Sequence, residues 1–432
     1  MKARVPCMNR TTLQWAPKAF GCSATSGCAV ALIGLTLWGL VVAGTAVARR
    51  SLEPGPKLRA IGEAGDGNFG VSVALSAKGK TALVGASGDN ADIGAAWAFT
   101  RSRAVWRQQD RKLSATGEFD NGGFGLRVAL SADGNTALIG GPLENGGIGA
   151  AWIFTRSGST WHQSAKLTPR LETGRSSFGE SVALSADGNT ALVGGPTDNA
   201  GAGAAWVFTR SGSTWKQQGQ KLSGEGEVGP GRLGVSVALS SNGGTAVAGG
   251  PLDANAVGAA WVFTRAGSTW REQGSKLTIK DIKSQAQFGS SVALSADGST
   301  TLIGAPVDDV DVGTAWVYTR SGSTWHQQGK KLKPAGKTGT VQFGGSVALS
   351  GAGNTALIGG ASDNGDVGTG AVWIFKRSGS AWSQQGEQLT GRNERGRAGF
   401  GSSVAISTDG SIGLIGGYND DGGVGAAWAY HL

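Results

Sequence analysis

Seven short runs of acidic and amide side chains are the residues of this chain whose types and spacing best suit binding chemistry. They recur about every 55 residues, each shortly before a Gly-Ala-Ala-Trp-like segment. Such oxygen-rich runs coordinate Ca²⁺ or hydrogen-bond a polar ligand, although Asp and Asn also favour turns for purely local reasons. Calcium is a candidate cofactor, above all at the loop of residues 308–311, but no metal is assigned. The ligand-binding candidates are Asp89, Asp92, Asp198, Asp308, Asp309, Asp311, Asp363, Asp366, Asp420 and Asp421.

Residues for catalysis form no recognisable set in the sequence. His162 and His326 stand at equivalent places after a Trp, His431 is next to last, and all three cysteines precede residue 29. Covalent catalysis needs a nucleophile and a base that can reach each other, and neither a Ser-His-Asp set nor a histidine-based metal cluster is visible. We therefore predict no catalytic residue.

The acidic runs belong to a longer repeat. In each unit a stretch such as FGESVALS is followed by a tight turn, often Asp-Gly, then by TALVGG, the acidic run, GAAWVFTR, a Ser-Gly turn and TWKQQGQKL. Period-two alternation and Asp-Gly pairs predict four short strands joined by hairpins. Seven such units predict an all-β fold, a seven-bladed β-propeller of four-stranded blades over residues 49–432. The units start at Phe69, Phe124, Phe178, Leu233, Phe288, Phe343 and Phe400.

Closure of the ring is predicted from spacing. The seventh unit ends at Leu432 without its fourth strand. In the other six units the Leu that ends strand four stands eleven residues before the next start, and Leu58 stands eleven residues before Phe69. We therefore expect the segment from Ser51 to Leu58 to supply the outer strand of the last blade. Tryptophans recur on strands three and four, which favours packing between blades over a stacking platform for sugars or bases.

Residues 1–48 differ in kind from the rest of the chain. They contain four basic residues, no acidic residue, and an uncharged apolar run from Cys28 to Ala48. This pattern predicts a secretory signal peptide with an Ala-x-Ala cleavage site, and the run is also long enough for an uncleaved signal-anchor helix. Either alternative predicts export, to a secreted, periplasmic or cell-surface location. Without this leader, 35 basic and 30 acidic residues leave a diffuse charge of +5, which predicts no nucleic-acid partner.

The units resemble FG-GAP repeats, the family of the integrin α-chain propeller, and look most similar to its exported bacterial form. Phe-Gly at the unit starts, Gly-Gly-Pro at residues 194–196 and the Gly-Ala-Ala-Trp segments carry the resemblance, which covers residues 57–432. It implies a seven-bladed propeller on secreted or surface proteins, used for adhesion or ligand binding. Integrin-type units carry a calcium loop between strands one and two, whereas residues 185–190 hold one carboxylate. Calcium takes six to eight oxygens, so the calcium function is not transferred to that turn.

The loops divide between two faces of the predicted propeller. The acidic 2–3 loops and the 4–1 loops between blades share one face and vary among units, as binding loops on a rigid scaffold commonly do. The other face repeats an Arg after strand three, which either attracts an anionic polymer or forms weak surface pairs with nearby Asp side chains. Positions facing the channel are mostly Gly, Ser and Ala. Arg127 and Glu180 are exceptions, as a site for a charged ligand or as tolerated variation.

These observations predict an exported, non-catalytic propeller, a monomeric domain that acts as an adhesion or ligand-binding module. The expected partner is an extracellular protein or glycan. A membrane contact is expected only through residues 28–48, if they are not cleaved. Two alternatives remain: an extracellular hydrolase or lyase with its site at the channel, and a structural surface-layer component.

Overall fold

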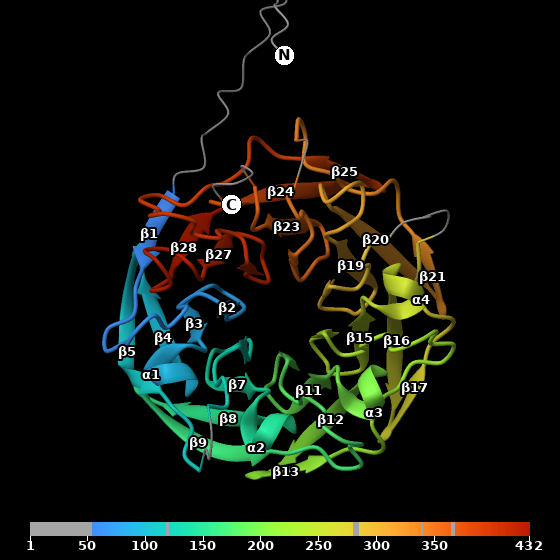
Figure 1. Ribbon diagram of the computed structural model, residues 1–432, viewed down its shortest axis with the longest axis horizontal. Helices are drawn as coiled ribbons and strands as arrows, with labels where there is room; N and C mark the ends of the chain where they lie inside the picture. The colour runs from blue at the N-terminus through green and yellow to red at the C-terminus, as the bar shows by residue number, and fades with distance from the viewer. Residues whose placement is uncertain (1–53, 118–120, 280–284, 338–339, 364–367) are drawn as a thin grey trace, which may run out of the picture. The chain divides into compact units, whose positions relative to one another are not determined.

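The computed structural model describes residues 54–117, 121–279, 285–337, 340–363 and 368–432, which form seven four-stranded antiparallel sheets around a central channel (Figure 1). This confirms the predicted seven-bladed β-propeller. The predicted signal or anchor helix at residues 1–48 lies outside the described residues. Within the described ranges, no helix is long and apolar enough to cross a membrane.

Each blade runs from a short inner strand at the channel to an outer strand at the rim. The inner strands are β2 (Ser72–Leu75), β6 (Arg127–Leu130), β10 (Ser181–Leu184), β14 (Ser236–Leu239), β18 (Ser291–Leu294), β22 (Ser346–Leu349) and β26 (Ser403–Ile406). The second strands are β3 (Thr81–Ala86), β7 (Thr136–Gly141), β11 (Thr190–Gly195), β15 (Thr245–Gly250), β19 (Thr300–Ala305), β23 (Thr355–Gly360) and β27 (Ile412–Gly417).

The third strands carry the buried tryptophans, and the outer strands face solvent. The third strands are β4 (Ala95–Ser102), β8 (Ala150–Ser157), β12 (Ala204–Ser211), β16 (Ala259–Ala266), β20 (Thr314–Ser321), β24 (Ala371–Ser378) and β28 (Ala426–His431). The outer strands are β5 (Val105–Leu113), β9 (Thr160–Leu167), β13 (Thr214–Gln217), β17 (Thr269–Glu272), β21 (Thr324–Gln327), β25 (Ala381–Gln384) and β1 (Pro54–Leu58).

The last blade is completed from the other end of the chain, as the spacing predicted. Its sheet has the order β1-β28-β27-β26, and β1 runs antiparallel to β28 with Lys57 opposite Trp428. The pairing confirms the prediction for Pro54 to Leu58. Residues 51–53 of the predicted strand lie outside the described residues.

The core lies at the seams between adjacent blades. The starting Phe of each blade pairs through its backbone with the Gly that precedes strand three of the preceding blade, as Phe124 does with Gly94. In five blades the same Phe ring meets the strand-three Trp of its own blade edge to face, with centroids 5.3 Å apart for Phe124 and Trp152. The third-strand tryptophans are buried in clusters drawn from two neighbouring blades. The tryptophan row therefore packs the blades together.

The outer strand is shorter than predicted in four blades. In all four blades the ladder stops before a Gln-Gly pair, and Gly219 in the third blade has φ 72°. Pairing resumes only at the terminal Leu, as Leu222 does with Ala205. The first two blades lack this Gly, and β5 and β9 run on to their terminal Leu. Gly enters the left-handed region without steric cost. Asp110, at the same place in the first blade, also has φ 65°, and there β5 continues through a shift in register.

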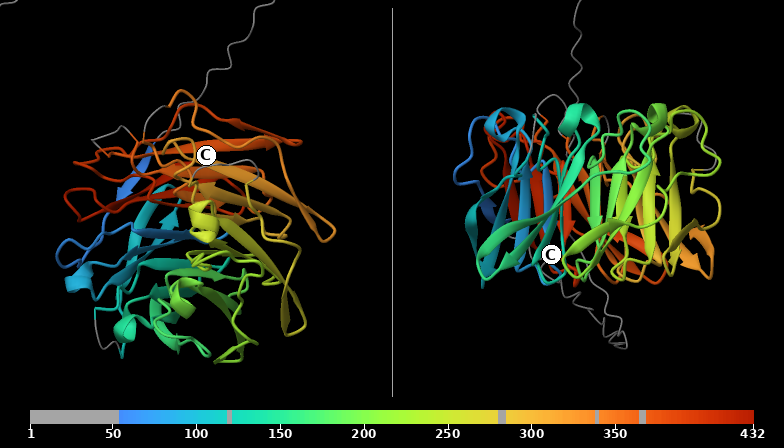
Figure 2. Two further views of the ribbon diagram at one scale, coloured as in Figure 1. Left: turned by 45° about the vertical axis from the view of Figure 1, so that its right-hand side comes forward. Right: turned by 90° about the horizontal axis from the view of Figure 1, so that it is seen from below.

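Four of the 2–3 loops contain a single turn that the sequence did not reveal: α1 (Asp89–Asp92), α2 (Glu144–Gly147), α3 (Asp198–Gly201) and α4 (Asp253–Ala256). Two residues inside each turn have left-handed φ and ψ, for example Asn90 with φ 53° and ψ 53°. Asn tolerates that region better than most residues. All four turns lie on the same face of the ring (Figure 2, right).

Candidate binding site

The first carboxylate of each 2–3 loop is buried rather than exposed. Its residue is at most 3% exposed in every blade. A charge removed from water in this way needs a partner of opposite sign. The set contains five of the ten predicted ligand-binding residues and two others: Asp89, Asp198, Asp308, Asp363 and Asp420, with Glu144 and Asp253.

A lysine neutralises each of these buried carboxylates. In the third blade, Lys221 Nζ lies 2.5 Å from Asp198 Oδ2, and the backbone N–H of Thr173 donates to Asp198 Oδ1 at 2.7 Å. The pair thus ties together the 2–3 loop of this blade, the segment after β13 and the 4–1 loop that leads into the blade. In six blades the lysine immediately precedes the Leu that ends the outer segment: Lys57, Lys112, Lys166, Lys221, Lys276 and Lys331.

The sixth blade keeps the same charge balance with different residues. Gln388 stands where the other blades have Lys, and its Nε2 donates to Asp363 Oδ2 at 2.8 Å. Lys337, from the preceding 4–1 loop, places Nζ 2.9 Å from the same oxygen. Sequence analysis missed this set of lysines. The sequence does contain one signal for these lysines. The sixth unit has Gln388 in place of the lysine, and the same unit has a lysine at position 337.

The other predicted ligand-binding residues lie nearer to solvent. Asp92, Asp309 and Asp311 are exposed, and Asp309 pairs with Lys333, whose hydrogen bond lowers the pKa of that carboxyl. Asp421 is partly exposed, with Arg59 Nη2 at 3.2 Å and Arg395 Nη1 at 3.3 Å. Asp366 lies outside the described residues. Among the described residues, no group of three His, Cys, Asp or Glu side chains is placed to hold a metal ion.

Two glutamates of the 4–1 loops lie beside buried carboxylates and have perturbed acidity. Burial, followed by the charge of Asp89, raises the pKa of Glu63 to about 7. Burial and the charge of Asp420 likewise raise the pKa of Glu394 to about 7, against a hydrogen bond from the backbone of Gly391. Among the described residues, Glu63 Oε1 is buried without a hydrogen-bond partner. These groups therefore hold protons near neutral pH.

Large exposed apolar side chains occur mainly in the 2–3 and 4–1 loops, in several blades around the ring. Val310 in a 2–3 loop is 89% exposed, and Ile61 in the segment that leads into the first blade is 73% exposed. Among the described residues, the comparable side chain elsewhere is Val105, at the start of β5 beside a 3–4 turn. Six of the seven large exposed apolar residues noted in the described chain thus share one face: Ile61, Leu143, Leu171, Val228, Val310 and Tyr418.

The repeated arginines of the opposite face stack on tryptophans. In the third blade, Arg210 lies 5.9 Å from the Trp215 ring centroid, and its Nε donates to Asn189 Oδ1 at 2.9 Å. No Arg–Asp ion pair occurs on this face among the described residues. The expected weak Arg–Asp pairing is therefore replaced by cation–π contacts, which hold these guanidinium groups against the outer strands. The equivalent arginines are Arg101, Arg156, Arg210, Arg265, Arg320 and Arg377.

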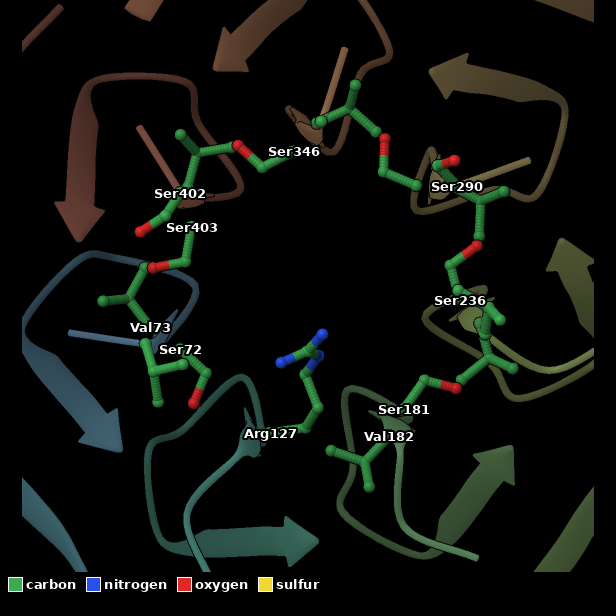
Figure 3. A pocket seen from close by; sticks show the side chains of 18 of the residues that line it. Ser72, Val73, Arg127, Ser181, Val182, Ser236, Ser290, Ser346, Ser402 and Ser403 are labelled. Carbon is green, nitrogen blue, oxygen red and sulfur yellow. The ribbon is translucent and has the colours of Figure 1, made fainter. Parts of the chain in front are cut away.

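The channel is lined by the seven inner strands and has a cavity of about 240 Å³ (Figure 3). Its wall consists of Ser, Val and Gly residues and one charged residue, Arg127, which points inward. Glu180, the other exception in the sequence, places Oε1 3.9 Å from Arg127 Nη2. The structure therefore brings these two residues together at the inner-strand starts of adjacent blades.

Comparison with known proteins gives a match to a family model described as FG-GAP repeat, at residues 161–208 and 270–318. Each matched range begins in the outer strand of one blade and ends in the third strand of the next. The matched unit is therefore offset by one strand from the structural blade. The search of curated proteins gives no match to this chain.

Proposed function

Because the chain is a β-propeller protein of FG-GAP repeats, we propose that it is an exported, non-catalytic module that binds a protein partner through the face of its 2–3 and 4–1 loops. The fold supports a ligand-binding or adhesion-type module in general, and the family is typically non-catalytic. Export rests on the sequence of residues 1–48, and cell adhesion on the resemblance to surface propellers.

The observation that carries this proposal is that six of the seven large exposed apolar side chains among the described residues belong to the loops of one face. Leu143 and Val310 stand in 2–3 loops, Leu171 and Val228 in 4–1 loops, and each is more than half exposed. Apolar side chains supply the buried core of protein–protein interfaces. Polysaccharides bind mainly through hydrogen bonds and ring stacking, so aliphatic side chains favour a protein over a glycan.

The buried ion pairs explain how this face is kept ready to bind. In six blades the Lys–carboxylate pair fixes a 2–3 loop to the 4–1 loop beside it, as Asp198 does through Lys221 and Thr173. Loops fixed before binding lose less conformational entropy when the partner docks. The variable side chains between these fixed points then decide which partner is bound.

The alternative of a hydrolase or lyase at the channel receives less support. Acid–base cleavage of a polymer needs two carboxyl groups within roughly 5–10 Å of each other. The described residues that line the channel include no carboxylate. Turnover of a polysaccharide or ester by the purified protein would nevertheless decide in favour of that alternative.

The binding test uses an array of purified extracellular proteins and polysaccharides. We expect the chain to bind a protein on the array, and Val310→Asp together with Leu143→Asp to reduce that binding at least tenfold. Val105→Asp, on the opposite face, is the matched control and should bind as the parent does. Equal loss in all variants, or binding to polysaccharides alone, would reject the proposed face and partner class.

The export test is independent of the binding test. The mass of the chain recovered from the producing cells should correspond to cleavage after Ala48, or the full-length chain should be found in the membrane fraction. Recovery of uncleaved chain in the cytoplasm would contradict export without bearing on the binding face.

A further inference from the structure

One position of the inner wall breaks the sevenfold pattern of the channel. The second residue after the starting Phe-Gly is Ser in six blades, and it is Arg127 in the second (Figure 3). These residues begin the inner strands and face the same cavity. The six serines at this position are Ser72, Ser181, Ser236, Ser291, Ser346 and Ser403.

The serines of the wall use their hydroxyl protons inside the protein. Ser181 Oγ donates to the Gly234 carbonyl of the next blade at 2.7 Å, and the other five at this position make the same bond across their seams. Ser290 and Ser402, which also line the cavity, donate to the carbonyls of Gln287 and Gly416. The serine wall therefore offers a ligand acceptor oxygens but little donor capacity.

The Arg127 guanidinium has N–H donors that its partners among the described residues do not use. Its Nη1 donates to the Leu126 carbonyl at 2.8 Å, and its only ion pair among the described residues is the loose contact with Glu180 at 3.9 Å. A guanidinium carries five N–H donors in a planar fork. The Arg127 side chain is 38% exposed, so the remaining donors are open to the channel.

We propose that the channel binds a small organic carboxylate, with its carboxylate on Arg127 and its apolar part against the valines of the wall. A planar guanidinium pairs with a carboxylate through two parallel hydrogen bonds. Valines from every inner strand line the site. Val73, Val128 and Val237 are buried in the seams, whereas the valines of the other four strands are partly exposed and suit an alkyl chain better than the hydration shell of phosphate: Val182, Val292, Val347 and Val404. The volume of about 240 Å³ limits the ligand to a small molecule.

Glu180 sets the strength of this site. Its carboxylate competes with the ligand for the guanidinium and repels any second anion. The equivalent residue is Val71 in the first blade and Val235 in the fourth. Equivalent positions in other blades therefore suggest the substitutions for a test: Ser for Arg127 and Val for Glu180.

The test titrates the purified full-length chain with acetate, butyrate and inorganic phosphate in a chloride buffer, followed by calorimetry and ligand-observed NMR. We expect butyrate to bind more tightly than acetate or phosphate. Arg127→Ser should weaken butyrate at least tenfold, while Glu180→Val should tighten it several-fold. Arg127→Ser restores the residue of the other blades and should melt no lower than the parent.

Three results would overturn the proposal. Equal affinity of butyrate for Arg127→Ser and for the parent would place the ligand elsewhere. Phosphate that binds as tightly as butyrate rejects the carboxylate class. Absence of butyrate binding to both the parent and Glu180→Val rejects the site itself. If Arg127→Ser does not fold, Arg127→Gln, which keeps a polar amide but removes the charge and the guanidinium fork, replaces it in the same titrations.

Discussion

Single residues in the 2–3 loops serve two different purposes. The first carboxylate of each loop is buried and paired with a lysine, so it stabilises the blade and is not available to a ligand. The following residues, such as Asp92, Asp311 and Val310, are exposed and are free to differ among units. An acidic run in the sequence thus combines one structural residue with neighbours available for binding.

Breaking one buried pair should destabilise the propeller. Lys221→Gln leaves Asp198 buried without a cation, and we expect a loss of about 3 kcal/mol in unfolding free energy, at the lower end for buried pairs because Lys221 is partly exposed. Urea denaturation measures the loss. Lys216→Gln, at an exposed position of β13 in the same blade, should change stability by less than about 0.5 kcal/mol.

The sixth blade suggests the rescue of that variant. Adding Glu172→Lys to Lys221→Gln copies the arrangement of Lys337 and Gln388 into the third blade, because Glu172 stands at the position of Lys337. The double variant should recover most of the lost stability. A double variant no more stable than Lys221→Gln would show that the lysine acts through packing rather than charge.

The raised pKa values of Glu63 and Glu394 predict a pH dependence of stability. The folded protein binds these protons more tightly than the unfolded chain, whose glutamates titrate near 4.5. Their stabilising contribution is therefore complete below about pH 4.5 and is lost as pH rises through about 7. Urea midpoints should fall between pH 5 and pH 8. The fall should be shallower in Glu63→Gln/Glu394→Gln, and an unchanged slope would contradict the assignment.

At the scale of elements, glycines set how closely neighbouring blades approach. A Cβ on Gly203 would lie 2.2 Å from the carbonyl oxygen of Leu233 in the next blade, and its φ is +83°. The Gly of the Gly-Ala-Ala-Trp segment is thus required by the seam itself. Gly212, in the 3–4 turn of the same blade, has φ +61° but meets nothing within 4 Å.

These two glycines give a matched test of the seam. Gly212→Ala should cost about 1 kcal/mol, the penalty of a left-handed Ala. Gly203→Ala carries the same penalty and also displaces the seam, so we expect a cost of about 3 kcal/mol or more. Chemical denaturation compares them, and equal costs would show that the seam relaxes freely.

At the scale of the molecule, the ring is closed by a single added strand. β1 covers the open edge of β28, and Lys57 on that strand neutralises Asp420. Phe69 then pairs with Gly425 to complete the last seam. Closure therefore combines edge protection, which keeps strands from pairing with other chains, with one of the seven buried ion pairs.

Removal of β1 should lower the stability of the propeller far more than removal of residues 1–53. A chain that begins at residue 54 should melt as the parent does. A chain that begins at residue 59 exposes β28 and leaves Asp420 without Lys57, so its melting temperature should fall by on the order of 5 °C or more. Scanning calorimetry and light scattering would detect the fall and the expected association. Identical melting of the two chains would show that β1 does not hold the ring.

The sequence predicted the fold better than the candidate site, for physical reasons. The repeats present a weak strand pattern seven times. The spacing between Leu58 and Phe69 was sufficient to predict which segment closes the ring. The site depends on contacts across the blade: Lys221 lies 23 residues from Asp198, so the burial of that carboxylate is not visible in the local pattern. The break of the outer strand at Gly219 was missed because the Gly was treated as part of the strand.

The closing strand also decides where the propeller is mechanically weakest. β1 is the first described element of the chain, so a pull through the N-terminal segment reaches β1 before any other strand. Peeling it from β28 would break the backbone pairs one after another and withdraw Lys57 from Asp420. The other outer strands are tied to their own blades by short turns and bear no such load. Under tension the ring should open at this one joint, with the remaining six blades intact.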